Sequence, residues 1–501
     1  MGTKSVIIIG SGIGGLIAGN LIAKKGHKVT IFESHSAPGG YTAGFYKKGF
    51  YFESGTLSFE ASASVFKAMK DIGVLDKISF TEQKIRWLSK DFDSIPRSYD
   101  DFKKMLYGAF PSEAAKLDKY FAETDLMYQA STKNNNKPFP FLYGGISFWL
   151  SIISYIFGAR KAMQFIKRYE NMTISQYNEQ YFDKQSKICR LLNELLYPDM
   201  SAWFTGSVLG MYNDYWTVLD GMQSWADVLA DNFKKLGGQL SLNSYVEKIL
   251  TKDGAAVGVS SNNTTFSADY VISACDYKKT FLEMLDDKSL IPQHLQAKIA
   301  AAAVSEAVFT VYLGLNISNQ QLQKYMKIHS VAYFDLESKA DISNPNDDGF
   351  FDKCSVNLYS PSMMNPALAP DGKSSLMLMA MPPTGWKDNW GGGDRQKYKQ
   401  LKEKAKKALL KKAECVIPSL SSFIEFEDAA TPLTYERFTH NTGGASSAWS
   451  WNPNKKFFPK TMSMNIDTPV KNLYIGSCWA NQIGGVPSAL IAAYMCSKKI
   501  H

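Results

Sequence analysis

The sequence predicts an α/β protein whose first folding unit is completed by segments from the middle and the end of the chain. Three observations lead to this prediction. Residues 6–33 read as strand, glycine-rich loop, helix and strand; residues 296–450 hold runs of alternating apolar residues; residues 472–490 read as a further strand, loop and helix. With 501 residues the chain is too long for one simple core, so we expect two or three lobes.

The N-terminal unit has the order and spacing of a dinucleotide-binding βαβ motif. A buried strand over 6–9 runs into a glycine-rich loop, and an apolar-faced helix and a second strand over 29–32 follow. The three glycines of such a loop allow a tight turn, approach of the backbone to a pyrophosphate, and close packing of helix on strand. Glu33 lies 18 residues after Gly15, near the spacing of about 20 expected for an acid that binds a ribose hydroxyl. We therefore expect the dinucleotide to contact Gly10, Ser11, Gly12, Ile13, Gly14, Gly15 and Glu33.

The chain then turns and later returns to this first lobe. Gly39 and Gly40 form a turn, and residues 49–55 read as a short strand with a glycine at each end. A helix predicted over 225–236 is followed by short strand patterns over 239–276. This block ends in an apolar strand, which is the pattern of a return to the first sheet.

A second lobe with a mostly antiparallel sheet is predicted for residues 296–450. The clearest period-2 runs are 308–313 and 376–381. A lysine-rich helix over 394–412 carries its apolar residues on one face, and its charged side is most simply solvated. Binding of that charged side to anionic lipid headgroups is the alternative.

Composition narrows the class of protein. A hydrophobic content of 45% with 21% charged residues is ordinary for a folded protein. The net charge of +9 is mild for this length and does not predict a nucleic-acid partner. None of the six cysteines forms a Cys-x-x-Cys pair, so we expect free thiols in a reducing compartment. No histidine has ligand spacing to a cysteine or an acid, so we expect no metal site.

The longest uncharged stretch, residues 138–159, is long enough to span a bilayer. We do not expect it to do so, because the C-terminal segment must rejoin the N-terminal fold on the same side of any membrane. Basic residues follow the stretch at once, which favours a dip into one leaflet. A buried helix or the wall of an apolar tunnel is the alternative. No secretory signal is visible, so we expect a cytoplasmic protein with peripheral contact at the inner face of a membrane.

Six blocks of the chain, taken in order, resemble the phytoene desaturase superfamily of flavoproteins, and within it the branch of carotenoid isomerases and retinol saturases. The resemblance runs nearly end to end. The chain departs from the family at Glu53, where an Asp is usual. It also has Ser477 where many members carry an Asp, but this branch often lacks that Asp. Trp479 fits this branch too. The blocks are 10–15 with Glu33, 39–55, 221–249, 366–373, 431–434 with 443–445, and 472–490.

The resemblance implies FAD as the cofactor, because the C-terminal block has no role in a simple nicotinamide dehydrogenase. It adds the expected FAD contacts Gly39, Gly40, Tyr41, Gly55, Val246, Gly476, Ser477, Gly485, Val486 and Pro487. A helix beginning near Pro487 would point its positive end at the flavin. No second Gly-x-Gly-x-x-Gly loop is visible, so the electron donor or acceptor is expected to be another molecule or a transient contact.

The implied architecture has three parts. A Rossmann-type, glutathione-reductase-like FAD domain is expected from residues 1–80, 220–290 and 460–501, and an antiparallel-sheet substrate domain from 81–120 and 291–459. Residues 121–219 would form a helical lid that faces the membrane.

The expected substrate is long, apolar and polyunsaturated, because the chain is rich in aromatic residues and carries the 138–159 stretch. Saturation, desaturation and cis–trans isomerisation of C=C bonds are all compatible with it. Candidate proton donors are Tyr215, Glu306 and His440, and candidate substrate contacts are Phe148, Trp149, Trp449 and Trp451. Two alternatives stay open: a flavin amine oxidase, with Cys478 as a site of covalent flavin attachment, or a non-catalytic lipid-binding flavoprotein.

Overall fold

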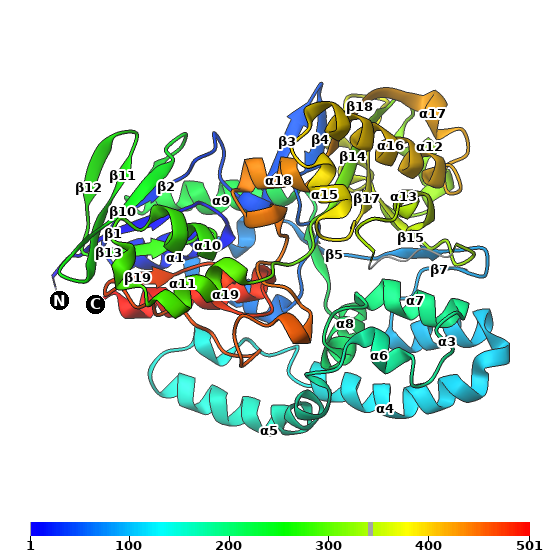
Figure 1. Cartoon of the computed structure of the whole chain (residues 1–501), viewed down its shortest axis with the longest axis horizontal. Coiled ribbons are helices and arrows are strands. Elements are labelled where there is room, and N and C mark those ends of the chain that lie inside the picture. The colour runs from blue at the N-terminus through cyan, green and yellow to red at the C-terminus, as the bar shows by residue number, and fades with distance from the viewer. Residues whose placement is uncertain (1, 339–343) are drawn as a thin grey trace.

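A five-stranded parallel sheet forms the first lobe and is assembled from three distant parts of the chain. The computed structural model describes residues 2–338 and 344–501. The sheet has the order β19-β13-β1-β2-β9, so the first and last strands of the chain lie two positions apart. Both termini lie at the same end of the molecule in Figure 1. The strands are β1 (Ser5–Ile9), β2 (Lys28–Phe32), β9 (Gln239–Ser241), β13 (Tyr270–Ser273) and β19 (Leu473–Ile475).

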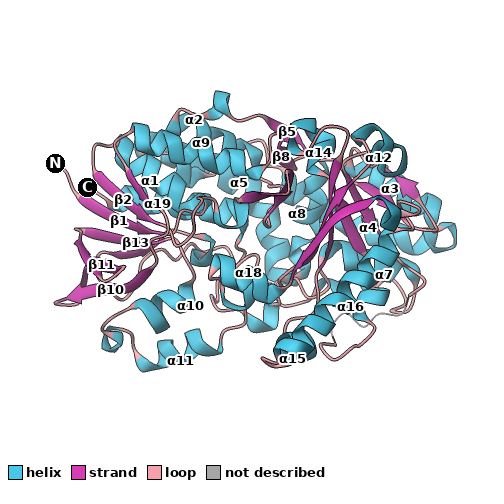
Figure 2. Cartoon of the chain, turned by 90° about the horizontal axis from the view of Figure 1, so that it is seen from above, coloured by secondary structure: helices cyan, strands magenta, loops and turns pink. Residues whose placement is uncertain are grey.

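Helices cover one face of this sheet and a small antiparallel sheet covers the other (Figure 2). The helices are α1 (Ile13–Lys24), α2 (Ser62–Ile72), α9 (Met222–Lys235) and α19 (Gly485–Lys499). The opposite face carries β10 (Val246–Lys252), β11 (Ala255–Ser261) and β12 (Thr264–Ser267), with α10 (Tyr277–Lys279) and α11 (Gln293–Ala301) nearby. This is the doubly covered arrangement that the buried, non-alternating strand 6–9 predicts.

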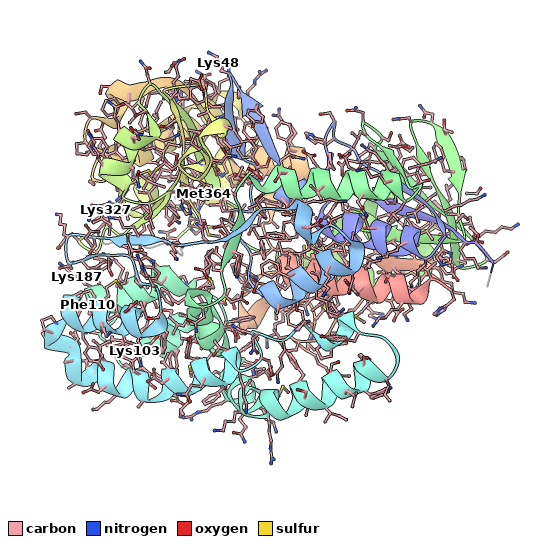
Figure 3. The ribbon with its side chains drawn as sticks, turned by 180° about the vertical axis from the view of Figure 1, so that it is seen from behind. Lys48, Lys103, Phe110, Lys187, Lys327 and Met364 are labelled. Atoms are coloured by element: carbon pink, nitrogen blue, oxygen red, sulfur yellow. The ribbon has the colours of Figure 1, made fainter. Side chains whose placement is uncertain are left out.

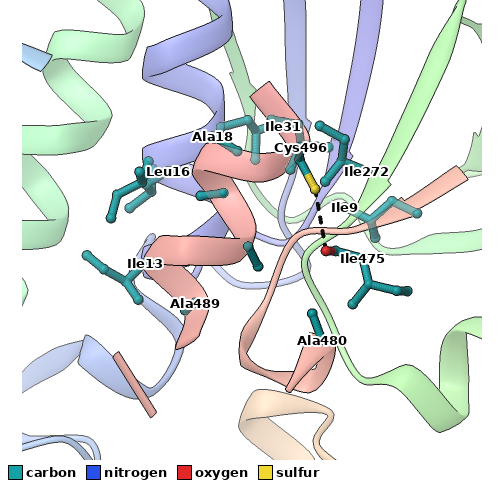
Figure 4. Packing of buried hydrophobic residues seen from close by; sticks show 14 of the residues in the cluster. Ile9, Ile13, Leu16, Ala18, Ile31, Ile272, Ile475, Ala480, Ala489 and Cys496 are labelled. Carbon is teal, nitrogen blue, oxygen red and sulfur yellow. Dashed lines mark hydrogen bonds between the residues drawn. The ribbon is translucent and has the colours of Figure 1, made fainter. Parts of the chain in front are cut away.

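The last helix closes the core of the first lobe. Figure 4 shows α19 packed between α1 and the strand β19, with Ala489 near Ile13. The Cys496 thiol donates a hydrogen bond to the carbonyl oxygen of Ile475 at 3.4 Å. The helix begins at Gly485, two residues before the predicted start near Pro487, because the turn that precedes it already ends at Gly484.

A seven-stranded, mostly antiparallel sheet forms the second lobe, in the order β18-β14-β17-β16-β15-β6-β7. Its period-2 runs place Val311 and Leu313 in one apolar cluster and Tyr312 in another, on the opposite face. The first cluster also holds Ala405 and Leu409 of the predicted lysine-rich helix. The strands are β6 (Arg86–Leu88), β7 (Asp93–Ser94), β14 (Phe309–Leu315), β15 (Ser330–Tyr333), β16 (Val356–Tyr359), β17 (Ser374–Ala380) and β18 (Ile424–Ala430).

The helices of this lobe lie between and beside its strands. They are α12 (Asn319–Met326), α13 (Phe350–Lys353), α14 (Pro361–Met364), α15 (Trp386–Gly391), α16 (Arg395–Ala413), α17 (Leu420–Phe423) and α18 (Pro432–Thr439). Two small antiparallel pairs of strands lie outside these sheets: a hairpin, and a pair formed by two strands that are distant in sequence. The first pairs β3 (Gly44–Lys47) with β4 (Phe50–Glu53), and the second pairs β5 (Phe80–Glu82) with β8 (Trp216–Val218).

A third, helical lobe has its own core. It contains α3 (Tyr99–Ala109), α4 (Ala114–Thr132), α5 (Gly145–Tyr169), α6 (Ile174–Asn178), α7 (Lys187–Leu196) and α8 (Thr205–Leu209). Residues 81–120 therefore divide: β6 and β7 join the second sheet, whereas α3 packs in the helical core rather than in the expected substrate domain. The reason is that Phe102 and Leu106 are buried in the apolar cluster that also holds Leu117 of α4 and Leu191 of α7.

The turn between β6 and β7 lies where the second and third lobes meet. Lys187 of the helical lobe pairs with Asp91, and Lys327 of the sheet lobe pairs with Asp93. Figure 3 shows these two lysines close to each other at one end of the molecule, with Phe110 and Lys103 farther into the helical lobe.

The helix α5 runs along the outer edge of the molecule in Figure 1, with no other element beyond it. Across residues 2–338 and 344–501, no helix is long and apolar enough to cross a membrane.

Candidate active site

A cavity of about 960 Å³ opens at the carboxyl ends of the parallel strands, where α/β sheets bind their ligands. Its walls come from the first glycine loop, the turn at 39–44, the C-terminal loop and the near face of the second sheet. Many of the predicted FAD contacts meet here: Gly10, Gly12, Ile13, Gly14, Glu33, Gly39, Gly40, Tyr41, Val246, Ser477, Gly485 and Val486 line the cavity.

The glycines of the first loop have two roles: two of them allow close packing, and one faces the space for the ligand. A Cβ on Gly15 would overlap the carbonyl oxygen of Gly10, and a Cβ on Gly14 would overlap that of Gly476. A Cβ on Gly12 would meet no atom within 4 Å. Gly12 is also the N-cap of α1 and carries no side-chain cap, so the free N–H groups of this helix face the cavity, as pyrophosphate binding requires.

Glu33 is held in place at the end of β2. One of its carboxylate oxygens, Oε2, accepts hydrogen bonds from the backbone N–H and the hydroxyl of Ser11 at 2.8 and 2.7 Å. The other, Oε1, accepts from the backbone N–H of His35 at 2.9 Å. The Ser34 hydroxyl also donates to Oε1, at 3.1 Å. The carboxylate thus lies at the cavity wall with its orientation fixed and accepts two hydrogen bonds on each oxygen, so a ribose hydroxyl would take the place of one of the two serine hydroxyls.

A second helix N-terminus enters the cavity from the C-terminal block. Gly484 and Gly485 both have φ of +74°, a conformation that favours glycine, and a Cβ on Gly484 would overlap the carbonyl oxygen of Ser447. This turn directs the first turn of α19 into the cavity, and Gly485 and Val486 line it. Its partial positive charge suits a ring that gathers negative charge on reduction.

The turn at 39–44 is fixed by a buried network around Glu53. Its carboxyl group accepts from the Tyr51 hydroxyl at 2.8 Å and from the backbone N–H of Met222 at 3.1 Å. Gln223 bridges to the turn, accepting from the Gly44 N–H at 3.0 Å and donating to the Pro38 carbonyl at 3.1 Å. Burial raises the pKa of Glu53 to about 8, and these hydrogen bonds partly oppose that rise. Glu53 is thus a structural acid that links β4 to the start of α9.

Five predicted FAD contacts do not line the cavity but support those that do. Ser11 is fully buried and bonds Glu33. Gly15, Gly55 and Gly476 allow close packing, since a Cβ would overlap Gly10, Tyr41 and Ile272, respectively. Pro487 lies in the first turn of α19.

The far wall of the cavity is aromatic, and sequence reasoning missed most of it. Tyr435 of α18 stacks on Tyr41 with ring centroids 5.7 Å apart and an interplanar angle of 2°. Its hydroxyl lies 2.7 Å from the Thr310 hydroxyl and 3.3 Å from that of Tyr312. The alternation of β14, which turns residue 312 away from the packed core, was the available signal for Tyr312.

The remaining predicted residues lie in several different places. His440 lines the cavity at the Glu33 end and contacts Tyr245, so it lies at the nucleotide rather than the ring end; burial lowers its pKa. Trp449 is fully buried in the core of the first lobe and donates to the Trp479 carbonyl at 2.9 Å. Trp451 donates to the carbonyl of Ile483 at 2.8 Å.

Neither tryptophan lines the cavity, and Phe148 and Trp149 lie on the outer helix α5. Tyr215 and Glu306 also lie outside the cavity lining, in a cluster that adjoins its wall.

The residues present fit FAD. Two helix N-termini, the carboxylate of Glu33 at the end of β2 and an open space at Gly12 lie along one cavity. The chain matches, over residues 13–501, the family described as flavin containing amine oxidoreductase, and it belongs to this family. It is a flavin-dependent oxidoreductase, and its cofactor is FAD.

Its relatives confirm the resemblance to the phytoene desaturase superfamily. The 4,4'-diapophytoene desaturase (4,4'-diapolycopene-forming) of Methylomonas sp is 27% identical over 99% of this chain and 96% of its own length. The chloroplastic prolycopene isomerase 1 of an Oncidium hybrid cultivar is 25% identical over 99% of this chain and 83% of its own length. The solved structure of cyclohexylamine oxidase from Brevibacterium oxydans has a TM-score of 0.61 at 14% identity, covering 100% of this chain and 99% of its own, and that likeness concerns the fold alone.

Proposed function

We propose that this flavoenzyme acts on C=C bonds of a long, apolar, polyunsaturated lipid of carotenoid, retinoid or related isoprenoid type, by saturation, desaturation or cis–trans isomerisation. The supporting observation is that the cofactor cavity continues to an apolar and aromatic wall on the second lobe, which includes Phe45, Tyr312, Leu433 and Tyr435. Relatives named as carotenoid desaturases and prolycopene isomerases match nearly the full chain and support the same reaction class.

When bound, FAD supplies hydride exchange at its ring. The chain supplies the positions of the reacting molecules. The Tyr41–Tyr435 stack would hold a flat polyene chain by its faces. The Tyr41 hydroxyl donates to the carbonyl of Gly444, and the Tyr435 hydroxyl bonds those of Thr310 and Tyr312, so these groups bring no water to the site.

The test is an absorbance spectrum of the purified protein before and after anaerobic dithionite, with a carotenoid or retinol then added. We expect flavin bands that bleach, and a polyene spectrum that shifts when the substrate is added. Return of the flavin bands with the shift indicates saturation, whereas a shift with the flavin still reduced indicates isomerisation. A reduced flavin that no polyene perturbs contradicts the proposal.

Amine oxidation is the second candidate function, favoured by the family to which the chain belongs. Covalent flavin attachment through Cys478 is not supported, because burial raises the pKa of this thiol to about 12 and the reactive form is the thiolate. An increase in the mass of the denatured chain by the mass of one flavin would show covalent attachment and contradict this conclusion. For a non-catalytic lipid carrier, we expect a flavin that dithionite fails to bleach while an apolar ligand is bound.

We also propose the three-part division in which 1–80, 220–290 and 460–501 bind FAD, and most of 291–459 forms the substrate wall. The helices of 121–219 would form the lid that meets the membrane from the cytoplasmic side.

The membrane contact rests on one stripe of α5. Ile146, Trp149 and Leu150 are 76%, 64% and 62% exposed, and Ile153 and Ile156 continue the same face. Exposed cationic side chains, Arg160, Lys161, Lys167 and Arg168, follow it. An apolar stripe with basic neighbours fits one leaflet of an anionic bilayer.

Vesicles of anionic and of neutral lipid test this contact. We expect wild type to sediment with anionic vesicles, and Trp149→Ser with Leu150→Ser to lose most of that binding. The matched control is Leu126→Ser, which removes a half-exposed leucine on α4 and should bind as wild type does. Equal binding by all three proteins would contradict the proposed face.

A further inference from the structure

Four titratable side chains from distant parts of the chain gather behind the wall of the cofactor cavity. They are Glu60, Tyr197, Tyr215 and Glu306. Tyr197 interacts electrostatically with both carboxyl groups, and Tyr215 interacts with Tyr197 and Glu60. The four therefore form one connected group, which we call the Glu60 cluster.

The Glu60 cluster touches the cavity wall at two points. Oε1 of Glu60 lies 3.9 Å from where a Cβ on Gly485 would stand, and Gly485 lines the cavity. The backbone carbonyl of Glu306 accepts from the hydroxyl and the N–H of Ser446 at 2.8 and 3.1 Å, and Ser446 also lines the cavity. Glu60 and Glu306 thus each lie directly against a residue that lines the cofactor cavity.

Glu60 and Tyr197 are accessible and yet desolvated. Both retain exposed surface, 37% in the case of Tyr197, but burial raises the pKa of Glu60 and raises that of Tyr197 to about 12. Accessible surface and desolvation occur together where a side chain faces a space that protein encloses rather than bulk water. Glu306 is half-buried, and its Oε2 has no hydrogen-bond partner. A partnerless carboxyl oxygen in such a place is costly unless it is protonated or meets a ligand.

The backbone holds these side chains in strained conformations. Ala61, next to Glu60, has φ of +60°, and Tyr197 has φ of +58°; neither is glycine. Asp214 accepts from the Ser62 N–H at 3.2 Å and so fixes the start of α2 beside Glu60. Strain of this kind is kept where the position of a side chain matters for function.

We propose that Glu60 is the acid–base residue of this flavoenzyme, with Tyr197 linking it to Glu306 as a second proton store. The proposal rests on the proposed C=C chemistry. In saturation, the C=C bond receives a hydride, with its electron pair, from the reduced flavin and a proton from the Glu60 carboxyl, which leaves a C–H on each carbon. In desaturation the same hydride and proton return to flavin and carboxylate.

The charges that face the cluster favour the proton-bearing state. Asp214 lies near Glu60, and Asp199 near Glu306, and both raise the pKa of their neighbour; Lys455 acts on Glu306 in the opposite direction. Burial is the largest cause in each case. A carboxyl group whose pKa is raised keeps its proton to higher pH, and the protonated form is the one that donates in general acid catalysis.

The test compares Glu60→Gln, Glu306→Gln and Tyr197→Phe with Glu194→Gln. Glu194 is a matched control because burial also raises its pKa, to about 7, while its partner is Ser355, outside the cluster. In protein labelled with 13C at the glutamate carboxyl groups, we expect four resonances that titrate above the ordinary range, those of Glu53, Glu60, Glu194 and Glu306, and each Glu→Gln variant should lose its own. Tyr197→Phe should shift the resonances of Glu60 and Glu306 and leave that of Glu194 unchanged.

Turnover gives the second measurement. We expect Glu60→Gln to lower kcat by about 10²- to 10⁴-fold with KM little changed, and Glu194→Gln to keep wild-type kcat. Retention of kcat and of the pH profile in Glu60→Gln overturns the proposal. If wild type converts no polyene, the proposed function fails, whereas the carboxyl titrations still test the cluster. The melting temperature and the bound FAD of each variant are measured to show that it folds. If Glu60→Gln or Glu306→Gln does not fold, Tyr197→Phe is used in its place.

Discussion

The helices α1 and α5 are both rich in apolar residues, but only one of them buries those residues. Ile13, Leu16 and Ile17 of α1 are buried within the first lobe, whereas Ile146 and Trp149 of α5 are exposed. No other element lies beyond α5 in Figure 1. Apolar content therefore identifies helices here, but only the arrangement of the lobes decides which helix forms core and which forms surface.

The largest expected effect is the difference in stability between the alanine variants of two tryptophans, Trp449 and Trp149. Trp449→Ala should destabilise the fold by about 3–5 kcal/mol, because Trp449 is fully buried and stacked on Phe457 at 4.0 Å. Trp149→Ala should change stability by at most about 0.5 kcal/mol, because its side chain is 64% exposed. Denaturant unfolding measures both. If Trp149→Ala were destabilised nearly as much as Trp449→Ala, the apolar face of α5 would have to be packed against another part of the protein. The difference between a buried α1 and an exposed α5 would then not hold.

A smaller effect is expected for alanine variants of two glycines in the first loop, one of which should lose stability and the other FAD affinity. Gly15→Ala should cost about 2–3 kcal/mol in the apoprotein, because its methyl group overlaps the Gly10 carbonyl. Gly12→Ala should leave apoprotein stability within about 0.5 kcal/mol. It should weaken FAD binding about tenfold or more, because its methyl group enters the open ligand space. Thermal melts of the apoprotein and titration with FAD measure the two effects. Unchanged FAD affinity in Gly12→Ala would place the pyrophosphate elsewhere.

Counted per pH unit, the smallest expected effect is a pH dependence of stability at Glu53. Burial raises its pKa from 4.5 to about 8, so the folded protein keeps a proton that the unfolded chain has released. This group's contribution is therefore fully present below pH 4.5 and is lost as pH rises towards 8. Glu53→Gln keeps an acceptor for the Met222 N–H without this ionisation.

The stability of Glu53→Gln relative to wild type should therefore rise by about 1.4 kcal/mol per pH unit within that window. Denaturant unfolding at several pH values measures this slope. A difference between the two proteins that does not vary with pH would show that Glu53 is ionised in the fold.

Much of the cofactor cavity was predictable because its chemistry is local. Gly12 and Glu33 are linked by a short, fixed spacing, and the C-terminal loop carries its glycines in sequence. The period-2 runs likewise predicted the second sheet, because alternation follows from strand geometry alone.

The rest depended on contacts that no spacing encodes. Trp449 was expected beside the substrate, but Phe457 and Trp479 enclose it in the core. Tyr435 meets Tyr41 only because α18 folds back over the turn at 39–44. Glu60 has no motif around it and was not singled out, because it gains its neighbours Tyr197 and Tyr215 only in the folded chain.

The position of β19 has a consequence for the folding of this protein during translation. The ligand-facing loop after β1 is made more than 450 residues before β19 and α19, which complete the sheet and the cavity. At translation rates of about 5–20 residues per second, the loop waits on the order of tens of seconds for its partners. Flavin loading is thus expected only after β19 and α19 have been made, and cellular flavin supply would decide how much newly made chain reaches its mature state.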